Sequence, residues 1–242
     1  MEIDWRLQDG FYNDLLVLNF TIVPNLNVLY SHMCVSKEVS LGAFIICTLT
    51  CFYLYKRNRV NDRWIAVMFG YFGSMQFLEY LMWKDQECNG LNQTATHIGF
   101  IHNILQPVLS LGAAYYFTGG NIPLYIYVIF IVYIITSLPR IIEAKKENQC
   151  SLPCNGTNDG LSWKYTETQY AWYVWGIFCI ALALPFITMK KNGYIYSGLI
   201  IAAYVMSHFI SVTRCPNRIT PPNGSWWCLM AVIVPLIALK IN

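Results

Sequence analysis

The sequence predicts an all-α protein built as a bundle of seven transmembrane helices, with the N-terminus outside and the C-terminus inside. Three observations lead to this fold class. Of the 242 residues, 56% are hydrophobic and only 12% are charged, whereas about a quarter of an average soluble domain is charged. Apolar runs long enough to cross a hydrocarbon core of about 30 Å recur along the chain. Basic residues concentrate in short segments between these runs.

The predicted chain has two parts. Residues 1–36 are expected to form an extracytosolic segment, because Asn and Pro residues interrupt its weakly apolar run and its charges are mostly acidic. Residues 37–242 are expected to form the membrane domain. Its seven spans are predicted, in chain order, at about 39–55, 64–83, 96–118, 122–138, 168–188, 194–213 and 225–240.

The distribution of positive charge predicts the orientation. Lys and Arg residues crowd the short loops 56–63 and 189–193, and Lys240 lies at the end of the last span. Because cytosolic loops are enriched in Lys and Arg, these segments are expected to face the cytosol. The longest loop, 139–166, is then expected to lie outside.

Asn-x-Ser/Thr sequences, which are acceptors for N-glycosylation, all fall on the predicted outer side. These candidate glycosylation sites are Asn19, Asn92, Asn155 and Asn223.

Cysteines follow the same division, and an oxidising exterior allows them to form disulfides. Cys88 is predicted to pair with Cys150 or Cys154, which would tie the start of the third span to the long outer loop. A metal site at Cys150 and Cys154 is the alternative. The disulfide candidates are Cys34, Cys88, Cys150, Cys154, Cys215 and Cys228.

Polar residues inside the predicted spans form the candidate binding site, since such residues usually face a bundle interior or a cavity. At 1.5 Å of rise per residue, Glu79, His102 and His208 are expected to lie at similar depth, about 6 to 10 Å below the outer boundary, on three helices. Pro107, directly after Gln106, removes a backbone donor within the third span. The binding or proton-linked candidates are Gln76, Glu79, His102, Asn103, Gln106 and His208.

Three interpretations of this polar set remain open. Interhelical hydrogen bonds could simply hold the bundle together, as in a structural protein of a viral or host membrane. The favoured interpretation is a centre that binds or passes a small solute, ion or proton, since histidines titrate near neutrality. The enzymatic alternative is a membrane-embedded, metal-dependent lipid hydrolase in which Glu79, His102 and His208 hold zinc with one open position.

Several classes of function are not supported. Retinal binding needs a Lys near the middle of the last span, where this chain has Ala231 to Pro235. The chain has no acidic-Arg-Tyr motif at the inner end of the third span, so G-protein coupling is not expected. Its net charge of +3 is spread out, which gives no support for a nucleic-acid partner. The expected partners are the lipid bilayer, a small solute or ion and a second copy of the chain, with no cofactor other than zinc.

A short pattern in the second and third spans carries a resemblance to a protein group. It comprises Met75-Gln76-x-x-Glu79-x-x-x-Trp83, followed by Cys88, Asn92 and Gln106-Pro107. In this pattern the chain resembles uncharacterised polytopic membrane proteins of large DNA viruses and protists. The resemblance implies a multi-pass protein of the secretory pathway or plasma membrane, or of a host membrane or virion for a viral source, and it implies no activity.

Overall fold

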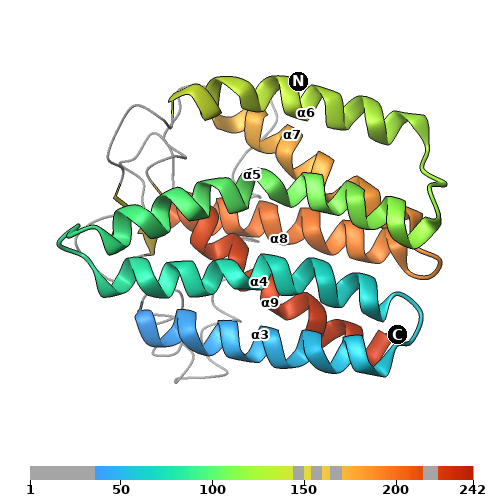
Figure 1. Cartoon of the computed structure of the whole chain (residues 1–242), viewed down its shortest axis with the longest axis horizontal. Helices are drawn as coiled ribbons and strands as arrows, with labels where there is room; N and C mark the ends of the chain where they lie inside the picture. The colour runs from blue at the N-terminus through green and yellow to red at the C-terminus, as the bar shows by residue number, and fades with distance from the viewer. Residues whose placement is uncertain (1–35, 144–149, 154–159, 164–170, 215–222, 242) are drawn as a thin grey trace, which may run out of the picture. The chain divides into compact units, whose positions relative to one another are not determined.

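The computed structural model describes residues 36–143, 150–153, 160–163, 171–214 and 223–241. Helices dominate these residues, which confirms the all-α class (Figure 1). A short antiparallel pair of strands, β1 (Leu152–Pro153) and β2 (Leu161–Ser162), places Leu152 opposite Ser162. The helices are α3 (Lys37–Arg57), α4 (Asp62–Lys84), α5 (Leu91–Thr118), α6 (Leu124–Glu143), α7 (Ala171–Ala183), the 3-10 helix η2 (Leu184–Thr188), α8 (Gly193–Arg214) and α9 (Asn223–Ile241).

Six predicted spans each overlap one of these helices and the fifth overlaps α7 and η2, but the helices differ in apolar character. Within the described residues, three segments are long and apolar enough to cross a membrane: Lys37–Arg57, Leu124–Ile142 and Gly193–Ile210. Tyr173–Thr188 and Val232–Ile241 are shorter apolar helices. The other two helices, α4 and α5, are long but carry buried polar and charged side chains that lower their mean hydropathy.

Helix boundaries differ from the predicted spans for local physical reasons. α5 begins at Leu91, before the apolar run, because the loop that precedes it supplies hydrogen-bond acceptors to its first turn. α6 continues through Pro139 to Glu143, so the predicted loop 139–166 begins later than expected. The fifth run is divided between α7 and η2, with Pro185 near the start of η2, where the missing proline N–H costs no helical hydrogen bond.

Small residues allow close packing of α4 against α3 and α5. A Cβ atom at Gly73 would collide with the Cys47 side chain of α3. A Cβ atom at Gly99 of α5 would lie 2.8 Å from the terminal methyl of Met75 on α4. α4 also packs on α9, whereas α6 packs mainly on α7. The core around α4 is therefore tight, and the more peripheral α6 leaves large apolar side chains such as Ile131 and Ile135 exposed.

Polar contacts join three chain segments at one end of the helices, which we call the basic end. The Arg57 guanidinium binds the Asp62 carboxylate through two hydrogen bonds of 2.7 and 2.8 Å. It also donates to the carbonyls of Ala238 and Leu239 in the last turn of α9, which have no helical donor of their own. Asn192 Nδ2 donates to the Ile241 carbonyl. The segments 57–62, 190–192 and 238–241 therefore meet.

A disulfide marks the opposite end of α4 and α5, which we call the disulfide end. Cys88, in the loop between α4 and α5, is bonded to Cys150, which lies just before β1. The predicted pairing of Cys88 with Cys150 or Cys154 is thereby resolved in favour of Cys150. In Figure 1 the loop between α4 and α5 lies at the left, and the loop between α3 and α4 lies at the right, beside the C-terminal end of α9.

Candidate functional site

The candidate site is a line of buried side chains along one face of α5, which we call the polar stripe. The stripe consists of Asn92, Thr96, Gly99, Asn103, Gln106 and Ser110. Its members alternate three and four residues apart, which is the spacing that keeps side chains on one face of a helix. From Asn92 to Ser110 the stripe is about 27 Å long at 1.5 Å per residue, close to the thickness of a hydrocarbon core. All of its side chains are buried although five of them are polar.

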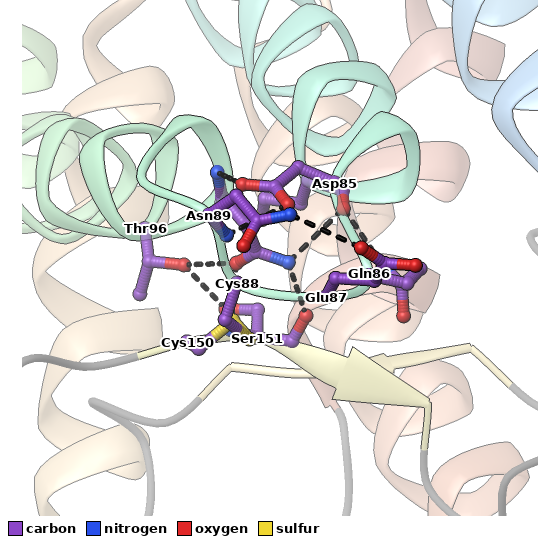
Figure 2. Close-up of a disulfide and its surroundings, with 10 residues drawn as sticks. Asp85, Gln86, Glu87, Cys88, Asn89, Thr96, Cys150 and Ser151 are labelled. Carbon is purple, nitrogen blue, oxygen red and sulfur yellow. Dashed lines mark hydrogen bonds between the residues drawn. A yellow bond between two sulfur atoms is a disulfide. The ribbon is translucent and has the colours of Figure 1, made fainter.

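The part of the stripe at the disulfide end is fully hydrogen-bonded. Asn92 Nδ2 donates to the carbonyls of Met82 and Ser151 at 3.0 and 2.8 Å. Asn92 Oδ1 accepts from the Ser151 N–H and from the Thr96 hydroxyl, and Thr96 also contacts the Ser151 hydroxyl. Figure 2 shows these bonds beside the disulfide. This part of the stripe therefore joins α5, the end of α4 and the segment after Cys150.

Asp85 supports the same region from the loop that follows α4. Its carboxylate accepts from the backbone N–H groups of Asn89 and Asn92, each at 2.9 Å. The N–H of Asn92 belongs to the first turn of α5, whose preceding residue, Gly90, provides no side-chain cap. Hydrogen bonds to the charged form, chiefly from Asn89 and then from Asn92, hold the pKa of Asp85 below its usual value. Asp85 thus acts as the N-terminal cap of α5 from a distance in sequence.

Gln76 and Glu79 lie together on one face of α4. Both side chains are buried, with 1% of each exposed. Gln76 Nε2 donates to Glu79 Oε2 at 2.8 Å. The spacing of three residues places them one above the other on the same helical face. α4 therefore brings an ionisable group into the bundle with an amide donor beside it.

His102 faces α4 at a different level from Glu79. Its ring stacks on Tyr71, with centroids 3.9 Å apart, and its Nε2 contacts the Ser74 hydroxyl and the Tyr71 carbonyl at 2.9 and 2.8 Å. Tyr71 and Ser74 precede Glu79 by eight and five residues, which corresponds to about 8 to 12 Å along the helix. The expected common depth of Glu79 and His102 is therefore wrong, because α5 starts earlier and runs antiparallel to α4 in a different register.

The middle of the stripe contains polar atoms without a partner. Both Nε2 and Oε1 of Gln106, and Oδ1 of Asn103, are buried and make no hydrogen bond within the described part of the chain. Ser110, one turn further, donates to the Leu182 carbonyl of α7. A buried polar group left unsatisfied costs about 1 to 3 kcal/mol. Such groups in a folded protein commonly indicate water, an ion or a ligand.

The predicted zinc ligands do not form a metal site in the described residues. His208 lies at an exposed position on α8, whereas Glu79 and His102 are buried and contact different partners. Among the described residues no group of three His, Cys, Asp or Glu side chains is arranged to hold a metal ion. Depth along single helices could not predict this result, because it depends on the rotation of each helix about its axis.

The predicted modification sites fall into two groups. Asn92 is described, and its Nδ2, the atom that would carry a glycan, is buried and donates two hydrogen bonds. A glycan on Asn92 and the observed packing therefore exclude each other. The remaining sites lie outside the residues, or the side chains, that the structure describes: Asn19, Asn155, Asn223, Cys34, Cys154, Cys215 and Cys228.

Sequence reasoning missed three contributors to this region: Tyr71, Ser74 and Ser151. Tyr71 and Ser74 bind His102 from α4, and Ser151 binds Asn92 across a large separation in sequence. One signal was present in the sequence. The spacing of 103, 106 and 110 extends back through 99 and 96 to 92, so periodicity alone could have included Thr96 and Asn92 in the stripe.

Comparisons with protein-family models, curated proteins and solved structures found no match for this chain. Functional inference therefore depends on the site itself.

Proposed function

We propose that the chain is a multi-pass membrane protein that binds or passes a small polar solute, ion or proton along the polar stripe of α5. All seven helices cross the membrane in this proposal. The N-terminus lies outside and the C-terminus inside, in a membrane of the secretory pathway or at the plasma membrane. The membrane crossing and the polar stripe have separate support, and each is argued in turn.

The disulfide supports the crossing of α5. Cys88 and Cys150 are bonded, so both must lie on the same side, and an even number of crossings must separate them. α6 lies between them and is long and apolar enough to cross. The other described helix between the two cysteines is α5, so α5 crosses as well. Its buried polar stripe explains why its hydropathy alone does not reveal this.

Contacts at the basic end support further crossings by the same argument. Asn192 and Ile241 are in contact. In the sequence, α8 lies between them and is apolar enough to cross. α9 must therefore return across the membrane. Asn61 binds the Lys191 carbonyl, so α4 and α7 either both cross or both remain on one side. α4 packs along α3 and its 23 residues extend over about 34 Å, which favours crossing.

Charge supports the orientation. Lys56, Arg57, Arg59 and Arg63 surround the loop between α3 and α4, and this loop contacts the loop that contains Lys190 and Lys191. Cytosolic segments close to membrane helices are enriched in Lys and Arg. The disulfide lies at the other end, where an oxidising compartment permits it. The basic end is therefore assigned to the cytosol.

The observation that carries the proposed activity is the contrast within the polar stripe. Asn92 and Thr96 have every side-chain polar group satisfied, as expected of residues that hold helices together. Gln106 has neither polar atom satisfied in the described residues. A structural role does not account for a buried amide that makes no bond, whereas a solute, ion or proton-carrying water would complete it.

Flux through reconstituted vesicles tests this proposal. Purified full-length protein is placed in lipid vesicles that contain a pH-sensitive dye, and proton flux is measured alongside uptake of radiolabelled sodium and glucose. Gln106→Leu is expected to reduce the flux that the wild type supports by about tenfold or more, equivalent to at least about 1.4 kcal/mol of barrier. Glu79→Gln is expected to reduce proton-coupled flux. Gln93→Leu, on a half-buried position of α5 outside the stripe, and Glu87→Gln are the matched controls.

Stability separates this activity from a structural role. Replacing an unsatisfied buried amide by an apolar side chain of similar size is neutral or stabilising. Gln106→Leu is therefore expected to keep or raise the melting temperature in detergent while it lowers flux. The proposal is contradicted if vesicles with wild-type protein are no more permeable to the three probes than empty vesicles. It is also contradicted if the Gln106→Leu variant shows unchanged flux.

A further inference from the structure

A hollow at the basic end combines positive charge with aromatic side chains, and we call it the basic pocket. Its volume is about 530 Å³. It lies between the loop before α4, the end of α5 and the segment after η2, with Arg59, Arg63 and Lys190 among its lining residues. None of its lining residues is acidic. Neither Arg59, Arg63 nor Lys190 forms an ion pair within the part of the chain that the structure describes.

A second hollow continues from the basic pocket along the outside of α4 and α5, and we call it the apolar groove. Its volume is about 710 Å³. It shares Arg63, Tyr116 and Phe117 with the basic pocket. Beyond these residues its lining is mainly apolar and includes Val67 and Leu109. A Cβ atom added at Gly112, also in its lining, would meet no atom within 4 Å, so the groove is open beside this residue.

The polar groups of the basic pocket suit an anion. Arg63 lies over the Tyr55 ring with its guanidinium carbon 5.3 Å from the centroid, an arrangement that leaves its N–H groups available to an acceptor. Trp64 lines the pocket and is 2% exposed. Its indole N–H has no acceptor among the described residues. Guanidinium and indole groups are donors only, and an anionic oxygen is an acceptor that would suit them.

The length of the apolar groove matches one leaflet of a bilayer. On α4 its lining extends from Arg63 to Ser74, which is about 16 Å at 1.5 Å per residue. Half of a hydrocarbon core of about 30 Å is about 15 Å. The groove begins at the basic end and therefore follows the cytosolic leaflet in the proposed orientation. Its length and its mainly apolar lining suit one acyl chain that is attached to a charged headgroup.

We infer that the basic pocket and the apolar groove together bind one anionic phospholipid of the cytosolic leaflet. The phosphate is held by Arg59, Arg63 and Lys190, and one acyl chain lies in the groove between α4 and α5. This inference rests on the proposed membrane crossing of α4 and α5. It does not depend on solute passage along the polar stripe, which lies on the buried face of α5.

Native mass spectrometry of the full-length protein in detergent tests the site. The protein is titrated separately with dioleoyl phosphatidylglycerol, dioleoyl phosphatidylcholine and glycerol phosphate. Phosphatidylglycerol is expected to bind at least about tenfold more tightly than phosphatidylcholine, since each Lys or Arg near an anionic headgroup contributes about fivefold. Arg63→Gln combined with Lys190→Gln is expected to weaken phosphatidylglycerol binding by roughly twentyfold. Gly112→Leu, which fills the groove, is expected to weaken binding of both lipids.

Matched variants control for charge and folding. Lys37→Gln with Lys84→Gln removes the same charge away from the basic pocket, and Gly198→Leu places the same side chain at an exposed, open position of α8. Both controls are expected to bind lipid as the wild type does. Three outcomes would overturn the inference. The first is equal affinity for the two lipids, and the second is glycerol phosphate binding as tightly as phosphatidylglycerol. The third is wild-type binding by both test variants. Lipid selectivity without solute flux contradicts only the proposed activity, and flux without selectivity contradicts only the lipid site.

Discussion

At the scale of single residues, Asn92 occupies a position where sequence pattern and packing give opposite expectations. Its sequon predicts a glycan, but its side chain is buried and bonded to α4, to α5 and to Ser151. We expect Asn92 to be unmodified in the folded protein and Asn92→Ala to lower the free energy of unfolding by about 3 kcal/mol, because several buried partners lose their bonds. Glycopeptide mass spectrometry and thermal unfolding in detergent measure the two effects.

Thr94 provides the control for this prediction. Thr94→Ala destroys the same sequon, yet Thr94 is exposed and its hydroxyl donates to the Gly90 carbonyl rather than to any partner of Asn92. The Thr94→Ala variant should show an unchanged protein mass on gels and an almost unchanged melting temperature. A loss of glycan mass on Thr94→Ala would show that Asn92 is modified and that the described packing does not form.

Asp85 gives a pH-dependent prediction at the same scale. Its pKa is lowered in the folded state, so its contribution to stability is complete above the unfolded-state value of about 3.9 and is lost as the pH falls through the folded-state value. Asp85→Asn should therefore lower the melting temperature at pH near 7, and the difference from the wild type should shrink at pH near 3. Thermal unfolding across this range measures the effect.

Glu87→Gln is the matched change, because it removes a carboxylate from the same loop. Glu87 is exposed and accepts a hydrogen bond from the exposed Asn89 side chain. The variant should show little pH-dependent difference from the wild type. A pH-independent loss of stability in Asp85→Asn would mean that the charge of Asp85 does not stabilise the start of α5.

Residue types were predictable in the candidate site, but most of their partners were not. The common face of Gln76 and Glu79 follows from their spacing on one helix, since an interval of three residues fixes their relative position. His102 was assigned to the wrong neighbour, because its partner depends on how α5 slides and rotates against α4. The contact of Ser151 with Asn92 was not predicted, since it depends on a disulfide between two cysteines that are 62 residues apart in sequence.

At the scale of elements, Gly73 controls the approach of α3 to α4. A Cβ atom there would collide with Cys47, whose thiol also bonds the Phe69 carbonyl at 3.3 Å. Gly73→Ala should lower the free energy of unfolding by about 1 to 2 kcal/mol through overpacking. Cys47→Ala in the same chain should recover most of this loss, because it removes the sulfur that collides. Chemical or thermal unfolding in detergent provides the measurement.

Gly42 is the comparison for Gly73, because an added Cβ there meets no atom within 4 Å. Gly42→Ala should be neutral or stabilising by up to about 1 kcal/mol, in line with the higher helix propensity of Ala. Equal effects of the two substitutions would show that α3 and α4 do not approach each other closely at Gly73.

The helices themselves were largely predictable from apolar runs, but their ends were not. Apolar length locates each helix because burial or lipid contact requires it. The start of α5 at Leu91 depends instead on polar bonds from Asp85 and Asn92. The extension of α6 accompanies the stacking of Arg140 over Trp175 of α7, with its guanidinium carbon 4.6 Å from the ring centroid. The mean hydropathy of a window of residues detects neither contact.

At the scale of the whole molecule, the central question is how many helices cross the membrane. Single cysteines introduced at exposed positions can answer it: Asn89→Cys in the loop at the disulfide end and Asn121→Cys after α5, at the basic end. In right-side-out vesicles, a membrane-impermeant maleimide should label Asn89→Cys at once. Asn121→Cys should react only after the vesicles are permeabilised.

A membrane protein with crossings by α3, α6 and α8 alone would behave differently. In that arrangement α5 does not cross, so Asn89→Cys and Asn121→Cys would react on the same side. Wild-type protein provides the background, since its described unpaired cysteines, Cys47, Cys51 and Cys179, are buried. Labelling of both variants before permeabilisation would contradict the seven-helix topology and, with it, the position assigned to the polar stripe.

The bond between Cys88 and Cys150 also has a consequence for biosynthesis. A chain emerging from the ribosome presents Cys88 long before Cys150. In the proposed topology, the two thiols can meet only after α5 and α6 have been made and inserted as a hairpin. Oxidation of this pair therefore shows that α5 and α6 have both been synthesised and brought together. In a time course of newly made protein, the oxidised fraction should report how quickly, and how faithfully, the hairpin of α5 and α6 enters the membrane.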